Sequence, residues 1–336
     1  MADALNADVR PILAEFLGDS PRHAVRPLSS GGFSGSRLWR VEADGRTFAL
    51  RRWPRPSPTV ARLQWIHRVI ESAQTQGFHC VAPAVSKRAG GTICAAEGHL
   101  WDLSPWLPGR AIAPGEANSD NIRCALAALA RLHGAIEASG NSLATGIPAG
   151  LVQRREEIRR WREQRFAQLA PALSRDRWPA GHAAARQFIP LAEQVLPTLD
   201  AELQAMASMA FPLQPCLCDV WSELVLFERG EVSGIIDYGA MRVDQVACDI
   251  ARLLGSYAAD APDRWHAGIA GYETVARLSD DQQALIRLYD RTTVVLAGLN
   301  WIRWVFLERR AFDDMPAAAR RLEHFLLRLE RLVNPP

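Results

Sequence analysis

Apolar and polar positions alternate through much of the first hundred residues of this chain. These period-two runs predict β-strands, and Ala43-Asp-Gly45 between two of them is a good hairpin signal. Apolar residues at helical spacing predict a short helix within 1–20 and a second helix over 59–75. The expected strands cover 24–28, 36–42, 47–53, 82–86, 91–96 and 99–104. We therefore expect this region to be mostly a sheet with one helix laid on it.

The pattern changes after Pro105-Trp-Leu-Pro-Gly109, which is a stiff, turn-forming connector. Strand patterns beyond it are confined to Leu213–Tyr238, where a hairpin turns at Glu228-Arg-Gly230-Glu231. The expected helices cover 118–137, 151–170, 178–207, 245–258, 262–276, 280–310 and 314–333. The predicted organisation is an α+β chain with a β-rich lobe over 1–104, a hinge over 105–110 and a helical lobe over 111–336.

Composition indicates a globular protein. The 336 residues allow one large or two medium domains, and 48% apolar residues can fill a sizeable core. The formal charge of +2 comes from 39 basic and 37 acidic residues, so it gives no argument for a nucleic-acid or membrane surface. Lys87 is the only lysine, and its neighbours do not form a Walker-type phosphate-binding loop.

Both the N-terminus and the apolar runs predict a soluble, cytoplasmic protein. The first ten residues carry acids where a signal peptide would need basic residues. The apolar run from Thr292 to Ile302 is too short to span a bilayer. Six cysteines are too sparse for a disulfide framework, and Cys216 and Cys218 are expected to be buried thiols that point the same way. We expect no nucleic-acid or membrane partner, and the oligomeric state stays open.

A glycine-rich loop, Leu28–Ser36, lies between two predicted strands. Glycines let backbone N–H groups approach phosphate oxygens closely, and a serine hydroxyl can add a donor. The candidate phosphate-binding residues are Gly31, Gly32, Ser34 and Gly35. The loop is followed by a strand rather than a helix, which argues against a dinucleotide-binding fingerprint. The alternative is a solvent-exposed hairpin turn.

Arg51 lies near the end of the predicted strand over 47–53. If the strand alternates, Phe48 and Leu50 share one face, and Arg51 shares the other with Ala49 and Trp53. Kinases place a lysine here to hold the nucleotide phosphates, and arginine supplies the same charge with a forked geometry. The alternative is a solvated arginine at the end of a strand.

Asp219 and Asp237 each stand beside apolar, strand-like residues. A buried carboxylate is costly unless it is hydrogen-bonded, paired or bound to a metal, and two of them on adjacent short strands suggest a site. In phosphoryl transfer, one aspartate can accept the proton of the attacking hydroxyl, and another can hold the magnesium ion that bridges the phosphates. The alternative is that both aspartates cap turns.

Together, the glycine loop, Arg51, the hinge, Asp219 and Ile235-Ile-Asp237-Tyr-Gly239 resemble the aminoglycoside phosphotransferase family, which has the protein-kinase-like fold and includes choline, homoserine and fructosamine kinases. The resemblance runs roughly from Leu28 to Gly255. It implies ATP and Mg²⁺ as cofactors and a small-molecule hydroxyl as phosphoryl acceptor. It also implies that Asp219 is the catalytic base, Asp237 a magnesium ligand, and Asp249 a mainly structural residue.

The chain departs from the family pattern around Asp219. Leu217 and Cys218 stand where the family has His and Gly, and Leu224 stands where it has Asn. Arg51 replaces the lysine, and the helix over 59–75 offers Gln64 where an acid is expected. These departures leave a pseudokinase or ligand-binding module as an alternative to an active kinase. A helical scaffold is a further alternative, suggested by the amphipathic C-terminal helices with Trp301, Trp304, Phe306 and Phe325. The acceptor pocket is expected within 150–210 and 262–310.

Overall fold

The computed structural model describes residues 8–19, 23–28, 35–141, 143–173, 178–312 and 314–334. The chain divides into two compact units, neither of which is one continuous stretch. The first unit comprises Met1–Glu116, Ala130–Asn141 and Ser222–Met241, and the second comprises Ala117–Leu129, Ser142–Trp221 and Arg242–Pro336. Packing thus places two later segments with the N-terminal sheet. The lobe boundaries expected at 104 and 110 stay a prediction.

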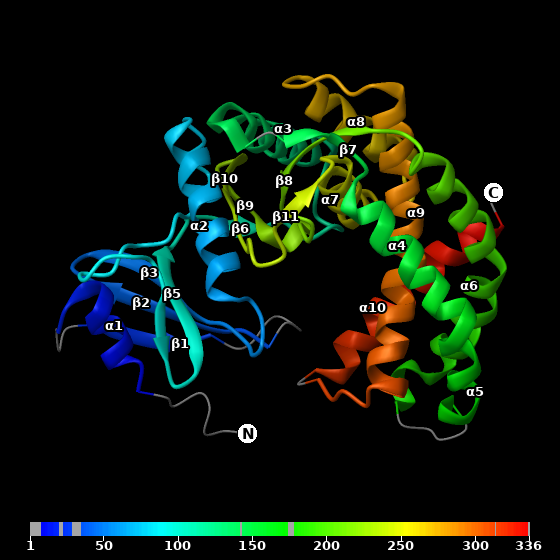
Figure 1. The fold of residues 1–336 in the computed structure, drawn as a ribbon, viewed down its shortest axis with the longest axis horizontal. Coiled ribbons are helices and arrows are strands. Elements are labelled where there is room, and N and C mark those ends of the chain that lie inside the picture. The colour runs from blue at the N-terminus through cyan, green and yellow to red at the C-terminus, as the bar shows by residue number, and fades with distance from the viewer. Residues whose placement is uncertain are drawn as a thin grey trace. The chain divides into compact units, whose positions relative to one another are not determined.

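A five-stranded antiparallel sheet forms the base of the first unit (Figure 1). In the order β1-β2-β3-β5-β4, it contains β1 (Ala24–Pro27), β2 (Arg37–Ala43), β3 (Arg46–Arg52), β5 (His99–Pro105) and β4 (Cys94–Ala96). Helix α1 (Arg10–Leu17) packs Leu13 and Phe16 into a core cluster with Phe48 and Leu50 of β3. The alternation predicted for β3 is confirmed on this face.

The expected strand over 82–86 is wrong, because this segment runs outside the sheet. Pro83 has no N–H to donate to a ladder, and Val85 contributes one backbone bond, to the carbonyl of Leu103 at 2.7 Å. Helix α2 (Val60–Thr75) precedes this segment. It begins at Thr59, whose hydroxyl accepts a hydrogen bond from the backbone N–H of Arg62 at 3.3 Å.

The predicted hairpin is confirmed as β9 (Val225–Glu228) and β10 (Glu231–Ile235), which pair antiparallel. Arg229 and Gly230 join the strands with φ of 54° and 88°, the left-handed geometry of a tight hairpin turn. A short strand that the sequence did not reveal, β6 (Arg110–Ala111), adds to β9 and completes a three-stranded sheet. The first unit also contains the 3₁₀ turn η4 (Ser222–Leu224).

The second unit is mostly helical and carries a three-stranded sheet in the order β11-β8-β7. Its strands are β7 (Leu143–Gly146), β8 (Phe211–Cys216) and β11 (Arg242–Asp244). Its helices are α4 (Ala149–Arg160), α5 (Phe166–Leu173), α6 (Pro179–Met206), α7 (Ala247–Ala258), α8 (Pro262–Glu273), α9 (Asp280–Ile302) and α10 (Met315–Val333). Helix α3 (Ser119–Ile136) belongs to the second unit up to Leu129 and to the first unit from Ala130 on. The π turn η2 (Glu137–Asn141), which follows it, belongs to the first unit. Among the described helices, none combines the length and apolar character needed to cross a bilayer.

Two helices that the sequence predicts as continuous contain π turns. One is η3 (Trp161–Arg165), between α4 and α5, and the other is η5 (Arg303–Leu307), after α9.

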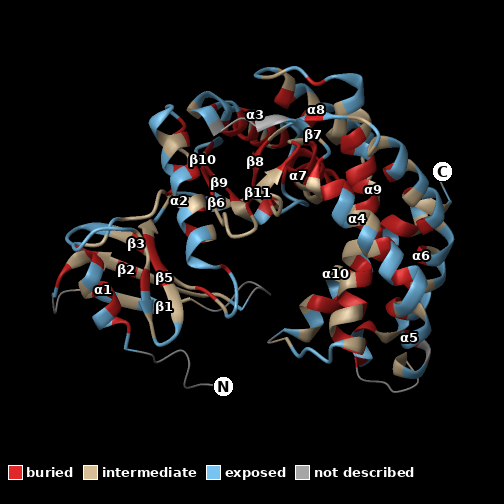
Figure 2. Cartoon of the chain, in the orientation of Figure 1, coloured by how far each residue is buried: buried red, intermediate tan, exposed pale blue. Residues whose placement is uncertain are grey.

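Helix α7 is the most completely buried of the described helices of the second unit (Figure 2), and residues such as Ile250 and Leu254 are fully buried. It therefore provides a fixed base for the polar side chains that it presents.

Gly109, at the end of the hinge segment, has a φ of 95°, and a Cβ atom added there would lie 2.5 Å from the carbonyl oxygen of Phe227. Gly109→Ala is expected to lower the free energy of unfolding by about 2–3 kcal/mol, because it adds backbone strain to this clash. Urea denaturation measures the change. Gly115→Ala is the control, because no atom lies within 4 Å of its added Cβ. A neutral Gly109→Ala would contradict the tight approach.

Candidate active site

The predicted phosphate-binding loop falls mostly outside the described residues. Gly31, Gly32 and Ser34 all lie there. Gly35 is described, and its φ of 77° is in the left-handed region that favours glycine. Strand β2 begins two residues later, at Arg37, so a strand follows the loop as predicted.

A cavity of about 270 Å³ lies in the first unit. Its apolar walls come from β2, α2, the hinge segment, β9 and the residues after β10, and include Leu38, Leu63, Ile66, Ile70, Leu107, Leu226 and Ile236. Polar groups gather among these walls, namely Arg51, Trp53, His67, Asp102, Asp237 and Tyr238. An apolar cavity with a few convergent polar groups is the usual form of a small-molecule site.

Arg51 and Asp237 meet in this cavity, although they are 186 positions apart in the chain. The Nη1 atom of Arg51 donates to Oδ1 of Asp237 at 2.7 Å. Burial by itself lowers the pKa of Arg51, but the carboxylate of Asp237 and the charge of Asp102 outweigh it, so the pKa lies above its usual value. Arg51 is therefore a permanent cation that faces the interior with Ala49 and Trp53, as the alternation of β3 predicts.

The backbone around Asp237 turns sharply. Strand β10 ends at Ile235, and Asp237 itself has a φ of 66°, a left-handed conformation that an aspartate adopts at some cost. The hydroxyl of Tyr238 donates to the carbonyl of Ile235 at 2.6 Å and accepts from the N–H of Ala82 at 2.9 Å. These bonds fix the turn, so the carboxylate of Asp237 is presented to the cavity.

Asp219 lies in the second unit, just after β8. Its Oδ1 atom accepts hydrogen bonds from the indole N–H of Trp221 at 2.8 Å and from Nε of Arg252 at 3.0 Å, and it also contacts Nη2 of Arg252. Burial alone raises the pKa of Asp219, but the guanidinium of Arg252 outweighs it and holds this pKa below its usual value. Asp219 is therefore ionised at neutral pH.

The expectation that the two aspartates lie on adjacent strands is wrong. Strand β8, before Asp219, pairs with β7 and β11, whereas β10, before Asp237, pairs with β9. Between the two aspartates the chain passes through η4, which lies after β8 of one sheet and before β9 of the other. Sequence reasoning also missed Arg252. Its only signal is that it stands one helical turn after Asp249.

Asp249 on α7 holds the backbone of the loop before Asp219. Its two carboxylate oxygens accept the backbone N–H groups of Leu217 at 2.7 Å and Cys218 at 2.6 Å. Cys218 has a φ of 64°, a conformation that glycine adopts more readily. Asp249 thus has the structural role that the resemblance implies, and it fixes the loop although the family's His and Gly are replaced.

A model of the phosphotransferase enzyme family matches residues 24–284 of the chain. The chain belongs to the phosphotransferase enzyme family. It is also 30% identical, over 275 residues, to a homoserine kinase of Gluconacetobacter diazotrophicus. The matched region covers 77% of this chain and 73% of that kinase. This phosphotransferase accordingly acts on a hydroxyl group of a small molecule.

Solved kinase structures share the fold of this phosphotransferase. An amicoumacin kinase in complex with AMP-PNP, Ca²⁺ and Ami matches with a TM-score of 0.67 at 15% identity, and the match covers 99% of this chain and 97% of that one. A spectinomycin phosphotransferase in complex with ADP and spectinomycin has a TM-score of 0.66 at 11% identity and covers 97% and 94%. The predicted protein-kinase-like fold is confirmed.

In this phosphotransferase, the position of the family asparagine belongs to a 3₁₀ turn. Leu224, which stands at this position, lies in η4 together with Glu223. The backbone carbonyl of Leu224 accepts from the N–H of Ile236 at 3.0 Å. This backbone hydrogen bond links the segment after Asp219 to the segment that carries Asp237.

A cluster of thiols lies beside the loop of Asp219. The Sγ atoms of Cys218 and Cys248 are 3.7 Å apart, and ligand atoms of Cys218, Asp244 and Cys248 all lie within 4.8 Å of one another. Burial raises the pKa of Cys216 to about 12 and also raises that of Cys248. The thiols are therefore protonated at neutral pH. The expectation of a buried thiol is confirmed for Cys216, but it is wrong for Cys218, which is half-buried and lies beyond the end of β8.

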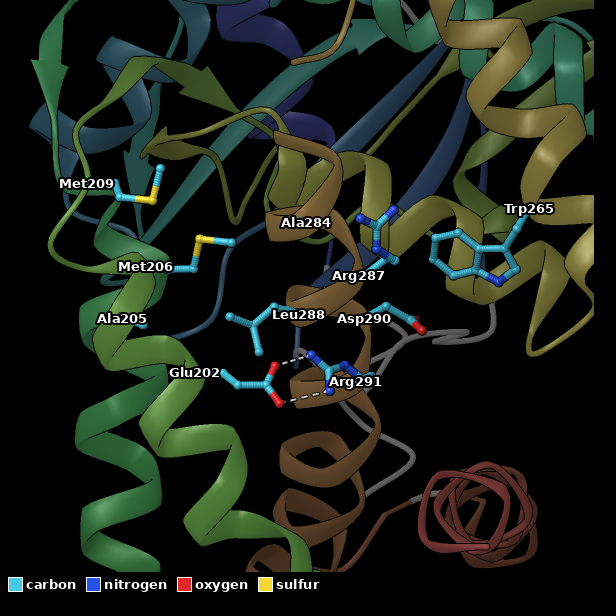
Figure 3. Close-up of a pocket in the computed structure, with 10 residues that line it drawn as sticks. All are labelled: Glu202, Ala205, Met206, Met209, Trp265, Ala284, Arg287, Leu288, Asp290 and Arg291. Atoms are coloured by element: carbon cyan, nitrogen blue, oxygen red, sulfur yellow. Dashed lines mark hydrogen bonds and ion pairs between the residues drawn. The ribbon is translucent and has the colours of Figure 1, made fainter. Parts of the chain in front are cut away.

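A second cavity, of about 700 Å³, lies among helices α6, α8 and α9 of the second unit (Figure 3). Met206, Met209 and Trp265 supply apolar surface, and Glu202 on α6 forms an ion pair with Arg291 on α9. These residues fall within the ranges predicted for the acceptor pocket.

Proposed function

We propose that this phosphotransferase transfers the γ-phosphoryl group of ATP to a hydroxyl group of a small molecule in the cytoplasm. The residue roles are Asp219 as catalytic base, Arg51 as phosphate contact, Asp237 as magnesium ligand, and Gly31, Gly32, Ser34 and Gly35 as the phosphate loop. The single observation that carries the proposal is the ion pair of Arg51 and Asp237 among the apolar walls of one cavity. This ion pair supports the proposal, because a cation suited to phosphates lies beside a carboxylate suited to a metal ion.

The cavity suits a nucleotide. Its volume of about 270 Å³ is just below the usual range for small-molecule sites, which starts at about 300 Å³, and its lining is largely apolar. Apolar residues such as Leu38 and Ile236 can cover the faces of a purine base. The permanent charge of Arg51 suits the phosphate chain, to which its planar fork can donate two hydrogen bonds.

Asp237 suits a magnesium ion. Magnesium in kinase sites usually takes one or two protein carboxylates together with substrate phosphates and water. The Asp237 side chain is 44% exposed, so it can reach such an ion, while Arg51 steadies one of its oxygens. When bound, the ion would neutralise charge on the phosphates. Leu224 cannot coordinate a metal, so we propose that this chain supplies a single carboxylate ligand.

Asp219 suits proton acceptance from the substrate hydroxyl. The donors from Trp221 and Arg252 all reach Oδ1, which leaves Oδ2 without a donor among the described residues of the second unit. The lowered pKa keeps the carboxylate ionised, so it can orient the hydroxyl and take its proton as the bond to phosphorus forms. Little other covalent chemistry is required of the protein.

Coupled measurement of ADP release across a panel of acceptors tests the proposal. The panel contains homoserine, which is suggested by the 30% identical homoserine kinase, together with amino alcohols, sugars, aminoglycosides and acyl-CoA compounds. Magnesium-dependent turnover with at least one acceptor is expected. If no compound is phosphorylated at high enzyme concentration while a nucleotide raises the melting temperature, the ligand-binding module is favoured instead.

A further inference from the structure

The cavity of the first unit is also lined by three polar residues to which the proposed function assigns no role. These residues are Trp53, His67 and Asp102. Asp102 on β5 stands directly opposite Arg51 on β3 in the antiparallel register. Residues in that relation share a face of the sheet. Asp102 is only 7% exposed, so its carboxylate needs partners within the protein.

Asp102 finds these partners on a strand and on a helix. Its Oδ2 atom accepts the indole N–H of Trp53 at 2.8 Å and lies 3.1 Å from Nε2 of His67 on α2. Because a carboxylate only accepts, the hydrogen lies on Nε2 of His67. The other ring nitrogen, Nδ1, lies 2.7 Å from Oγ1 of Thr92, which fixes the orientation of the imidazole. The indole of Trp53 is therefore anchored at its polar edge.

Arg51 rests on this anchored indole. Its Cζ atom lies 4.7 Å from the centroid of the Trp53 ring, while its Nη1 atom donates to Asp237 at 2.7 Å. A planar guanidinium stacks on an aromatic face, whereas a compact lysine ammonium does so less well. The arginine that replaces the family's lysine is thus matched by an aromatic surface suited to it.

We propose that Asp102 and His67 are positioning residues for Arg51, because they fix the Trp53 indole on which the guanidinium rests and so direct it toward the nucleotide phosphates. In protein kinases a helix glutamate holds the corresponding lysine. Here helix α2 contributes a histidine instead, and the acid is on the neighbouring strand. The inference rests on the proposed function only in taking a nucleotide as the ligand of Arg51.

A double-mutant cycle on nucleotide binding tests this inference without any acceptor. Calorimetry with AMP-PNP and Mg²⁺ is expected to show that Asp102→Leu, which removes the oxygen that accepts from Trp53 and His67, weakens binding about tenfold, as loss of an orienting partner commonly does. In an Arg51→Lys background, the same change is expected to have little further effect, because no guanidinium remains to be oriented. Asp44→Asn, in the exposed turn before β3, is the matched control.

Variants of His67 separate positioning from folding. His67→Gln keeps an N–H donor and is expected to retain most of the affinity, whereas His67→Leu is expected to behave like Asp102→Leu. Equal weakening by Asp102→Leu in both backgrounds, unchanged binding in Asp102→Leu, or a wild type that binds no nucleotide would each overturn the inference. A wild type that binds AMP-PNP but phosphorylates no acceptor would count against the proposed function. The double-mutant cycle would still test the positioning of Arg51 in that case, because it measures only nucleotide binding.

Discussion

Asp219→Asn is expected to lower turnover by a factor of about 10²–10⁴, which is the usual contribution of a positioned general base. Asparagine keeps an oxygen for the donors from Trp221 and Arg252, so the loop keeps its shape, but its amide cannot take the proton of the substrate hydroxyl. Steady-state kinetics with saturating ATP measure kcat. Affinity for nucleotide, measured by calorimetry, is expected to change little.

The matched control is Asp263→Asn, because this residue is exposed in the first turn of α8 in the same unit. It should leave kcat unchanged. The lowered pKa of Asp219 adds a second expectation, since the carboxylate stays ionised below the usual pKa of an aspartate. Loss of activity near neutral pH on acidification should then come from other groups. Unchanged turnover in Asp219→Asn would remove this residue as the base.

Asp237→Asn is expected to lower turnover by about 10²–10³, because a negative charge that holds the metal beside the phosphates is removed. Its signature is a shift of magnesium dependence to higher concentration, which titration of activity against MgCl₂ measures. Asp219→Asn should show no such shift. The variant also removes the charge partner of Arg51, whose side chain is 17% exposed, so the melting temperature should be recorded in parallel.

Glu228→Gln is the control for Asp237→Asn, because Glu228 ends the neighbouring strand β9 and is exposed. Its removal changes the net charge of the same segment by the same amount. If both variants shift the magnesium dependence equally, the effect is one of general charge, and Asp237 is not a ligand.

Local patterns predicted most elements of the fold. The Asp-Gly turn and alternating residues gave β2 and β3, and helical spacing gave α2, α7 and α10. The elements that were missed or misplaced depend on distant partners. Strand β6 is two residues long and exists because β9 lies beside it, whereas residues 82–86 have strand composition but run outside the sheet. Neither fact is encoded in the spacing of nearby residues.

The site divides in the same way. Sequence alone determined that Asp219, Asp237 and Arg51 are candidates, because each sits in a local motif whose residue types and order are typical of phosphoryl transfer. Only the tertiary structure decided that Arg51 pairs with Asp237, that Arg252 holds Asp219, and that a tryptophan, a histidine and a strand aspartate stand behind the guanidinium. Hydrogen bonds and ion pairs form between whichever groups packing brings within about 3 Å, and for these residues the partners are up to 186 positions apart.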